Sequence, residues 1–292
     1  MRAMGRERVG GARVLWRLLE PVHAVTYFSP EPLAALKAAG YRGFWMGYFA
    51  GRAAPLGATG PELVHALFYN FTFDHVARAL PDAWGFAPPE AALAARSEGS
   101  VAALRRHLGE QASAPEIERA AEIAARAAAA APLEGRPLFA ANRSLPEPDE
   151  PLARLWHAAT LLREHRGDGH VATLLAAGIG GRAAHVFHAI ASGTPADTYA
   201  AARHLGPDEW DALVAGLRER GYVDDAGTLT DAGRAAKRDV EDRTDAAAWS
   251  AYEQLDDAEL DALVAALRPV TAAVVAAGEI PVRSPMGLDL SS

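Results

Sequence analysis

The sequence predicts a mainly α-helical protein in which an N-terminal helical domain is followed by a C-terminal winged-helix domain, a helix-turn-helix with a short β-hairpin. Apolar residues recur at intervals of three and four along most of the chain, which is the spacing of one helix face. Glycines and prolines divide this pattern into segments of helical length. A strand-like pattern around a tight turn lies at residues 220–230, which places the hairpin in the C-terminal half.

The chain of 292 residues exceeds the usual size of one domain, about 100–200 residues, and therefore predicts two domains. Helical periodicity is lost between Pro132 and Pro151, where proline, glycine and acidic residues are concentrated. We expect an aromatic-rich helical domain at 1–132, a linker at 133–151 and a winged-helix-like domain at 152–292.

Composition and charge limit the function classes. Because the chain has no cysteine, disulfides, thiol nucleophiles and Cys-ligated zinc are excluded. No signal peptide is evident, and no run of about 18 uncharged apolar residues occurs, so we expect a cytoplasmic protein without a membrane partner. The net charge of −8 disfavours attraction to a phosphate backbone.

Helices are expected in order along both halves. In the C-terminal half, the glycines of 166–169 predict a turn between two helices, and Asp231 begins a helix after the hairpin. The expected helical segments of the N-terminal half are 12–25, 33–40, 44–49, 61–70, 73–82, 88–110 and 115–131, and those of the C-terminal half are 152–165, 170–177, 182–192, 208–219, the helix from 231 and 258–277.

The hairpin region carries a family resemblance. The stretch from Leu213 to Gly233 reads LVAGLRERGYVDDAGTLTDAG and resembles the recognition helix, wing and following helix of MarR-type winged-helix regulators. Three other stretches are similar to actinobacterial SalK-like proteins, often labelled MarR-like, and this likeness spans most of the chain: LWRLLEPVHAVTYFSPE, RGFWMGYFAGRAAPLG and LREHRGDGH. The resemblance implies a winged helix and the DNA-binding role of MarR-type regulators, but no particular activity.

DNA contacts, where they occur, are expected from Arg218, Arg220 and Arg234. The surrounding charge disfavours them, because 203–245 holds 11 acidic and 7 basic residues. The hairpin turn, 224–227, carries two aspartates where MarR-type proteins have basic residues. The alternative is that the winged helix serves for packing or dimerisation, and the sequence permits a homodimer.

A pocket for a small organic ligand is expected in the N-terminal domain. Fourteen of the 22 aromatic residues lie between Trp16 and Phe86, interleaved with a few polar side chains, as in small-molecule sites. The alternative is an ordinary aromatic core. The candidate ligand-binding residues are Tyr27, Phe44, Trp45, Tyr48, Arg52, His65, Phe68 and Tyr69, with Arg52 favoured as the residue that binds an anionic group.

Acid–base residues cluster at 164–170, where His165 and Asp168 flank a glycine, and His23 is a further candidate. The alternative is that Asp168 caps a helix that begins near His170. The histidine spacing matches no zinc signature, and no cofactor motif is evident, since the glycines of 178–181 follow a helix rather than a strand.

Taken together, these patterns predict a small-molecule-binding, MarR-like winged-helix protein, in its most specific form a ligand-responsive transcriptional regulator. The alternative is an enzyme of specialised metabolism that uses the winged helix as a scaffold. In that case His23, Arg52, His165 or Asp168 would perform acid–base chemistry in the aromatic pocket.

Overall fold

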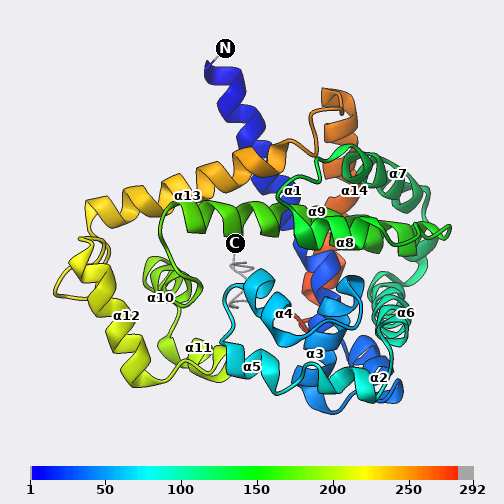
Figure 1. The fold of residues 1–292 in the computed structure, drawn as a ribbon. Coiled ribbons are helices and arrows are strands. Elements are labelled where there is room, and N and C mark those ends of the chain that lie inside the picture. The colour runs from blue at the N-terminus through cyan, green and yellow to red at the C-terminus, as the bar shows by residue number, and fades with distance from the viewer. Residues whose placement is uncertain (1, 282–292) are drawn as a thin grey trace.

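The computed structural model describes residues 2–281, which form a mainly helical protein, as predicted (Figure 1). Its α-helices are α1 (Arg2–Phe28), α2 (Pro30–Ala38), α3 (Gly43–Ala53), α4 (Pro61–Phe68), α5 (Phe73–Ala77), α6 (Pro89–Leu108), α7 (Pro115–Ala130), α8 (Pro137–Arg143), α9 (Pro151–Ala176), α10 (Gly181–Ser192), α11 (Ala196–Arg203), α12 (Pro207–Glu219), α13 (Asp231–Trp249) and α14 (Asp257–Ala276). Three short 3₁₀ turns, η1 (Ala54–Leu56), η2 (Asp82–Gly85) and η3 (Gly109–Ser113), connect some of them.

The residues at the helix starts explain why many of the helices begin where they do. Seven helices, α2, α4, α6, α7, α8, α9 and α12, have proline at their first position, where its fixed φ is favourable and its missing N–H costs no hydrogen bond. At α14, Asp256 and Glu259 form a reciprocal capping box. The helix expected at 73–82 is shorter, because α5 ends at Ala77 and a proline-containing turn follows.

The predicted turn at 166–169 is wrong, because α9 continues through both glycines to Ala176. Tertiary packing overrides the low helix propensity of glycine, about 1 kcal/mol per residue. A Cβ on Gly169 would lie 2.7 Å from Nη1 of Arg136 and 3.4 Å from Ala247. The missing side chain therefore lets neighbouring segments approach a helix that crosses the molecule.

The predicted β-hairpin is not formed as two strands. Among residues 2–281 the only pairing is a single antiparallel bridge between Val223 and Leu229. Two backbone hydrogen bonds flank it, from Asp224 N–H to the carbonyl of Thr228 at 2.9 Å and from Thr230 N–H to the carbonyl of Tyr222 at 3.0 Å. The pairing does not extend beyond this bridge. The β-hairpin of the predicted winged helix is therefore not shown.

The main hydrophobic core draws on both halves of the chain. Helix α1 packs against α9, α13 and α14, and α7 packs against α9 and α14. Leu15 and Leu19 share this core with Leu155, Leu263 and Leu267. The stretch predicted as a linker contains helix α8, which packs on α9. The core therefore does not divide at 133–151, because α1 lies among C-terminal helices.

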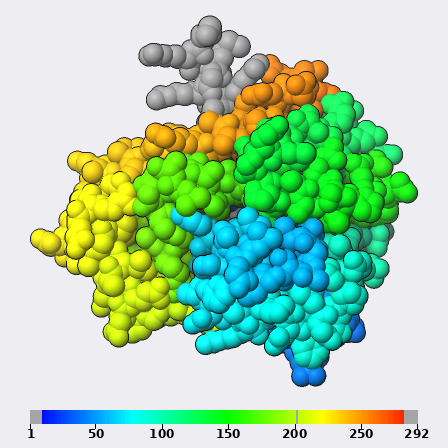
Figure 2. Space-filling view, viewed as in Figure 1, coloured from blue at the N-terminus to red at the C-terminus, as the bar shows by residue number. Residues whose placement is uncertain are grey.

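Helices α10, α11 and α12 form a helix-turn-helix unit with a smaller core of its own, built around Phe187, Tyr199 and Leu217. The turn between α11 and α12 spans 204–206. Figure 2 shows this unit, coloured yellow-green to yellow, lying beside the cyan aromatic helices. No single helix in 2–281 is long and apolar enough to cross a membrane, and the one helix pair that passes by composition, α9 with α10, is bent by 98°.

One backbone contact between the unit and the aromatic half is unusually close, and side-chain contacts such as the stacking of His204 on His75 accompany it. Tyr69 follows α4 with φ 49° and ψ −48°, a conformation that is costly for a residue with a side chain. Its hydroxyl donates to the carbonyl of Ile179 at 2.7 Å, and its own carbonyl lies against Gly181. A Cβ on Gly181 would lie 2.0 Å from that carbonyl oxygen. Position 181 therefore requires glycine.

We expect Gly181→Ala to lower the free energy of unfolding by about 1–3 kcal/mol, because the added methyl group forces apart the two backbones. Gly216→Ala is the matched control, since no atom lies within 4 Å of a Cβ there and alanine favours the interior of α12. Chemical denaturation of both variants checks this. Equal stability of Gly181→Ala and wild type would show that the contact is not tight.

Candidate functional site: a central cavity

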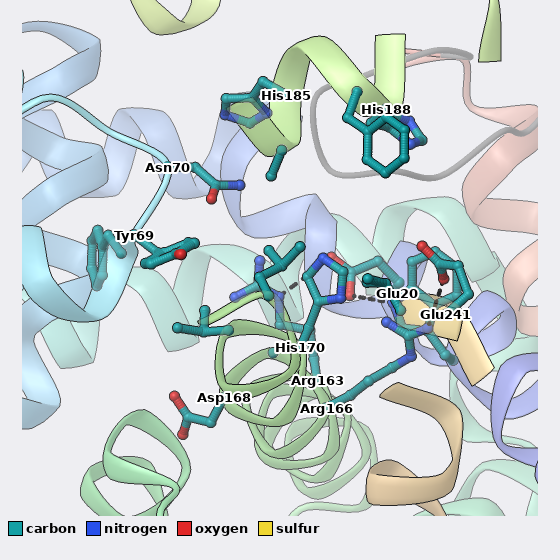
Figure 3. A pocket seen from close by; sticks show the side chains of 18 of the residues that line it. Glu20, Tyr69, Asn70, Arg163, Arg166, Asp168, His170, His185, His188 and Glu241 are labelled. Carbon is teal, nitrogen blue, oxygen red and sulfur yellow. Dashed lines mark hydrogen bonds and ion pairs between the residues drawn. The ribbon is translucent and has the colours of Figure 1, made fainter. Parts of the chain in front are cut away.

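A cavity of about 460 Å³ lies between the helix-turn-helix unit and the rest of the protein. Its walls come mainly from α1, α9, α10, α13 and the loop after α4, with single positions or pairs from α3, α8 and α11. In Figure 3, His185 and His188 of α10 face His170, Arg163 and Arg166 of α9 across this space. The volume falls within the range of about 300–1,000 Å³ that is typical of small-molecule sites.

One wall of the cavity is a buried ion-pair network. Arg52 of α3 contacts both carboxylate oxygens of Glu164, at 3.3 and 3.4 Å. Arg163 contacts Glu164 at 2.7 Å and Glu20 at 3.4 Å. Burial alone would raise the pKa of Glu164, but the positive charges of Arg163 and Arg52 lower it to about 2. This carboxylate is therefore ionised and balances two guanidinium groups.

A second network closes the side formed by α1 and α13. Arg166 bonds Asp245 at 2.9 Å, and Arg13 bonds the same carboxylate at 2.6 Å. Lys237 contacts Glu241 at 2.6 Å. Burial alone would raise the pKa of Glu241, but the charge and hydrogen bond of Lys237, together with the charge of Arg166, outweigh it and lower the pKa to about 2. These cations are paired with carboxylates in the same way as Arg52 and Arg163.

The loop at 68–71 lies between two further guanidinium contacts. The guanidinium carbon of Arg52 lies 4.1 Å from the ring centroid of Phe68, and that of Arg203 lies 4.4 Å from the centroid of Phe71. Both are cation–π distances. The aromatic rings of Phe68 and Phe71 and the guanidinium groups stacked on them therefore border the same space.

Three histidines border the cavity. His170 lies 3.0 Å from the hydroxyl of Thr244. Burial lowers the pKa of His170 and of His188 to about 4, and lowers that of His185 as well. At neutral pH these imidazoles are uncharged hydrogen-bonding groups. In the described part of the chain, no group of three or more histidine, aspartate or glutamate side chains is arranged to hold a metal ion.

Asp168 lies at the edge of the cavity, and Figure 3 shows its side chain directed away from His170. It accepts a hydrogen bond from Phe139 N–H at 2.9 Å, so it caps the start of α8. The prediction that it caps a helix beginning near His170 is wrong, because both residues lie inside α9. Burial raises the pKa of Asp168 to about 7, which makes it the cavity's only carboxyl group, among residues 2–281, with a pKa raised toward neutrality.

The sequence model of a family described as helix-turn-helix matches residues 12–281, nearly the whole chain. The chain belongs to this helix-turn-helix family. No curated protein and no solved structure matches it. The family suggests a protein of the DNA-binding regulator kind. Because the match covers α1 to α14, the helix-turn-helix family includes the cavity as well as the helix-turn-helix unit.

The predicted DNA-contacting arginines are all engaged in contacts with nearby parts of the chain. Arg218 Nε donates to the carbonyl of Asp224 at 2.9 Å, and Arg220 donates to the carbonyls of Gly178 and Ala177 at 2.7 and 2.9 Å. Arg234 donates to the carbonyl of Leu229 and bonds Asp231. All three guanidiniums thus satisfy orphan carbonyls at helix ends and in the hairpin loop.

The predicted ligand-binding residues separate into two groups. Four of them, Tyr48, Arg52, Phe68 and Tyr69, line the cavity. The other four do not line it and contact neighbouring side chains: Tyr27 bonds His23, Trp45 packs on His75, His65 meets Phe73, and Phe44 is 43% exposed beside Trp45. Spacing identified an aromatic cluster, but only its edge borders the empty space.

The predicted acid–base residues are not assembled into one site. His23 is buried between Thr160 and Tyr27, with ring nitrogens 2.9 and 3.0 Å from their hydroxyls. His165 packs edge-on against Phe139, and burial lowers its pKa to about 3. Neither histidine lines the cavity, so of the four candidates only Arg52 and Asp168 do.

Sequence reasoning missed much of the cavity wall. Arg163 and Arg166 lie three residues apart in α9, a helix whose other residues are mostly apolar. Most of the residues of this helix are buried. Charged residues at helical spacing in a buried helix indicate a polar interior. That pattern was the available signal, whereas Glu20 and Arg203 carry none that local sequence reveals.

The raised pKa of Asp168 predicts a pH-dependent stability. Unfolded, the carboxyl group titrates near pH 4, about its ordinary value, whereas in the folded protein it holds its proton up to about pH 7. The contribution of this group to the free energy of unfolding is therefore fully present below pH 4. It decreases as the pH rises from 4 to 7, by up to about 1.4 kcal/mol per pH unit.

We expect Asp168→Asn to remove this loss, so the variant gains stability relative to wild type as the pH rises from 4.5 to 7.5. Asparagine keeps an oxygen that accepts from Phe139, and the buried histidines contribute equally to both proteins. Guanidinium denaturation at several pH values measures the difference. Parallel stability curves for the two proteins would show that Asp168 titrates normally.

Proposed function

We propose that this member of the helix-turn-helix family binds a small organic molecule in the central cavity, and that its helix-turn-helix unit responds to the bound molecule. The observation that carries the proposal is the position of the cavity. Its walls include α10 of the helix-turn-helix unit on one side and α1, α9 and α13 on the other. A molecule in this space therefore contacts the helix-turn-helix unit and the rest of the protein at the same time.

The chemistry of the walls supports a small-molecule ligand. Aromatic surface comes from Trp16, Phe68, Phe71 and Phe187, while polar groups converge from α1, α3, α9, α10, α11 and α13. Apolar walls with a few fixed polar groups are the usual composition of small-molecule sites. Most of the cavity's charged groups are held by the two ion-pair networks, so they are already oriented before a ligand enters.

A structural route for the response runs through the loop at 68–71. Phe68 and Phe71 face the cavity, and Tyr69 between them bonds Ile179 and contacts Gly181 at the start of α10. A ligand that displaces either ring therefore acts on the backbone that supports the helix-turn-helix unit. Binding shifts such an equilibrium only by its difference in affinity for the two arrangements.

The cavity predicts saturable binding of the neutral fluorophore N-phenyl-1-naphthylamine. Ala184 of α10 lines the cavity, so Ala184→Phe should fill part of it and weaken binding at least about tenfold, or about 1.4 kcal/mol. Ala215→Phe is the matched control, because Ala215 is exposed on α12. Fluorescence titration of all three proteins measures this, and absent binding or equal loss in both variants contradicts the proposal.

DNA binding is a second candidate function, favoured by the family. The exposed residues of α12 include Asp208, Asp211 and Glu219, and its one exposed arginine, Arg218, bonds the hairpin loop. A surface of this charge repels phosphate groups. We therefore propose that the helix-turn-helix unit serves mainly as the responsive scaffold rather than as a sequence reader.

Accordingly, we expect no retardation of the chain's own upstream DNA in a gel-shift assay at low salt. Ala215→Lys adds one positive charge to the exposed face of α12 without touching the internal arginine contacts, and it is expected to create weak, salt-sensitive binding. Retardation by the wild-type protein that Ala215→Glu abolishes would instead establish α12 as a DNA-reading helix.

A further inference from the structure

Arg203 is the last residue of α11 and directly precedes the turn of the helix-turn-helix. Its guanidinium lines the central cavity. Its Nε donates to Nε2 of His185 at 3.2 Å, and its Nη1 donates to the carbonyl of Ala202 at 2.9 Å. Below it lies the ring of Phe71. Each of these partners is uncharged.

This lack of a carboxylate separates Arg203 from the other buried cations of the cavity. Arg52, Arg163 and Arg166 are each bonded to a glutamate or aspartate. No ion pair of Arg203 is found among the described side chains. Burial lowers the pKa of Arg203, which expresses the cost of removing this charge from water. A buried charge without a counterion normally marks a functional position.

Among the side chains of the described residues, those near Arg203 supply no counterion. Arg182 lies near enough to lower its pKa further, and it is itself bonded to Glu209 at 2.7 Å. Arg52 also lowers the pKa of Arg203, so the two guanidiniums repel one another across the loop at 68–71. His185 accepts from Arg203 through Nε2, so its proton is on Nδ1, where the backbone of Asn70 bonds it.

We propose that Arg203 is the anion-binding group of the cavity and that the molecule bound there is an organic anion with an aromatic or aliphatic body. The inference rests on the proposed ligand-binding function. A carboxylate, sulfonate or phosphate group would pair with Arg203, and the apolar body would lie against Phe68, Phe71 and Phe187. His185 is a positioning residue that fixes the orientation of the guanidinium.

Charge balance over the whole cavity agrees with this ligand class. The lining includes seven arginine and lysine residues against three acidic ones, in a chain whose net charge is −8. One of the three, Asp168, has a pKa of about 7 and is only partly ionised at neutral pH. Behind the lining, Glu164 and Asp245 pair with four of the seven cations, so a small excess of positive charge remains, seven cations against five acidic residues. This excess favours entry of a small anion over contact with a polyanion.

A matched pair of fluorescent probes tests the proposal. The probes are 8-anilinonaphthalene-1-sulfonate and N-phenyl-1-naphthylamine, which share one ring system and differ in the sulfonate. We expect the wild-type protein to bind the sulfonate more tightly than the neutral probe. We expect Arg203→Gln to weaken binding of the sulfonate at least about tenfold, or about 1.4 kcal/mol, and to leave the affinity for the neutral probe within about twofold.

Two further variants make the result specific. Arg119→Gln removes the same charge from an exposed position on α7 and should change neither affinity. Arg203→Lys keeps the charge and should retain much of the preference for the sulfonate. If Arg203→Gln does not fold, the wild-type comparison of the two probes still decides, because a wild-type preference for the neutral probe overturns the proposal.

The outcomes separate this inference from the proposed function. Binding of both probes with no effect of Arg203→Gln on the sulfonate overturns the anion site but leaves the cavity as a ligand site. An equal loss in Arg203→Gln and Arg119→Gln also overturns it, because it reveals an effect of overall charge. Failure of both probes to bind, or binding unaffected by Ala184→Phe, contradicts the proposed function itself.

Discussion

The contact on which the architecture most depends is the buried pairing of Arg52 with Glu164. It links α3 in the aromatic half to the middle of α9, the helix that crosses the molecule. Glu164 is shared with Arg163, so loss of the carboxylate would leave Arg52 without a carboxylate partner and Arg163 with Glu20 alone. Glu164 therefore holds together two guanidinium groups of the cavity wall that would otherwise repel one another.

Local sequence chemistry predicted most helices, because proline at first positions and caps such as Asp256 act within a few residues. It failed where distant packing decides. The glycines of α9 look like a turn until Arg136 is seen against Gly169. The division at 133–151 looked like a linker because nothing local shows that α1 packs among the C-terminal helices.

The site was predictable to the same extent. Tyr48, Arg52, Phe68 and Tyr69 were found because they belong to one aromatic cluster, and that cluster borders the cavity. The cavity's remaining walls come from α1 and from helices of the C-terminal half, which no local pattern connects to the aromatic cluster. The charges of the sequence were a second source of prediction. They identified α12 as acidic, but they could not show that Arg203 lies inside without a counterion.

The contact between Tyr69 and Gly181 has a mechanical consequence. Most interfaces inside proteins are made by side chains, which change rotamer and so absorb small displacements. Here two backbones touch with no side chain between them. No side-chain rotamer can absorb a shift of the loop at this contact, so such a shift acts directly on the first turn of α10. The absence of a side chain at Gly181 thus couples the loop at 68–71 rigidly to the start of the helix-turn-helix unit.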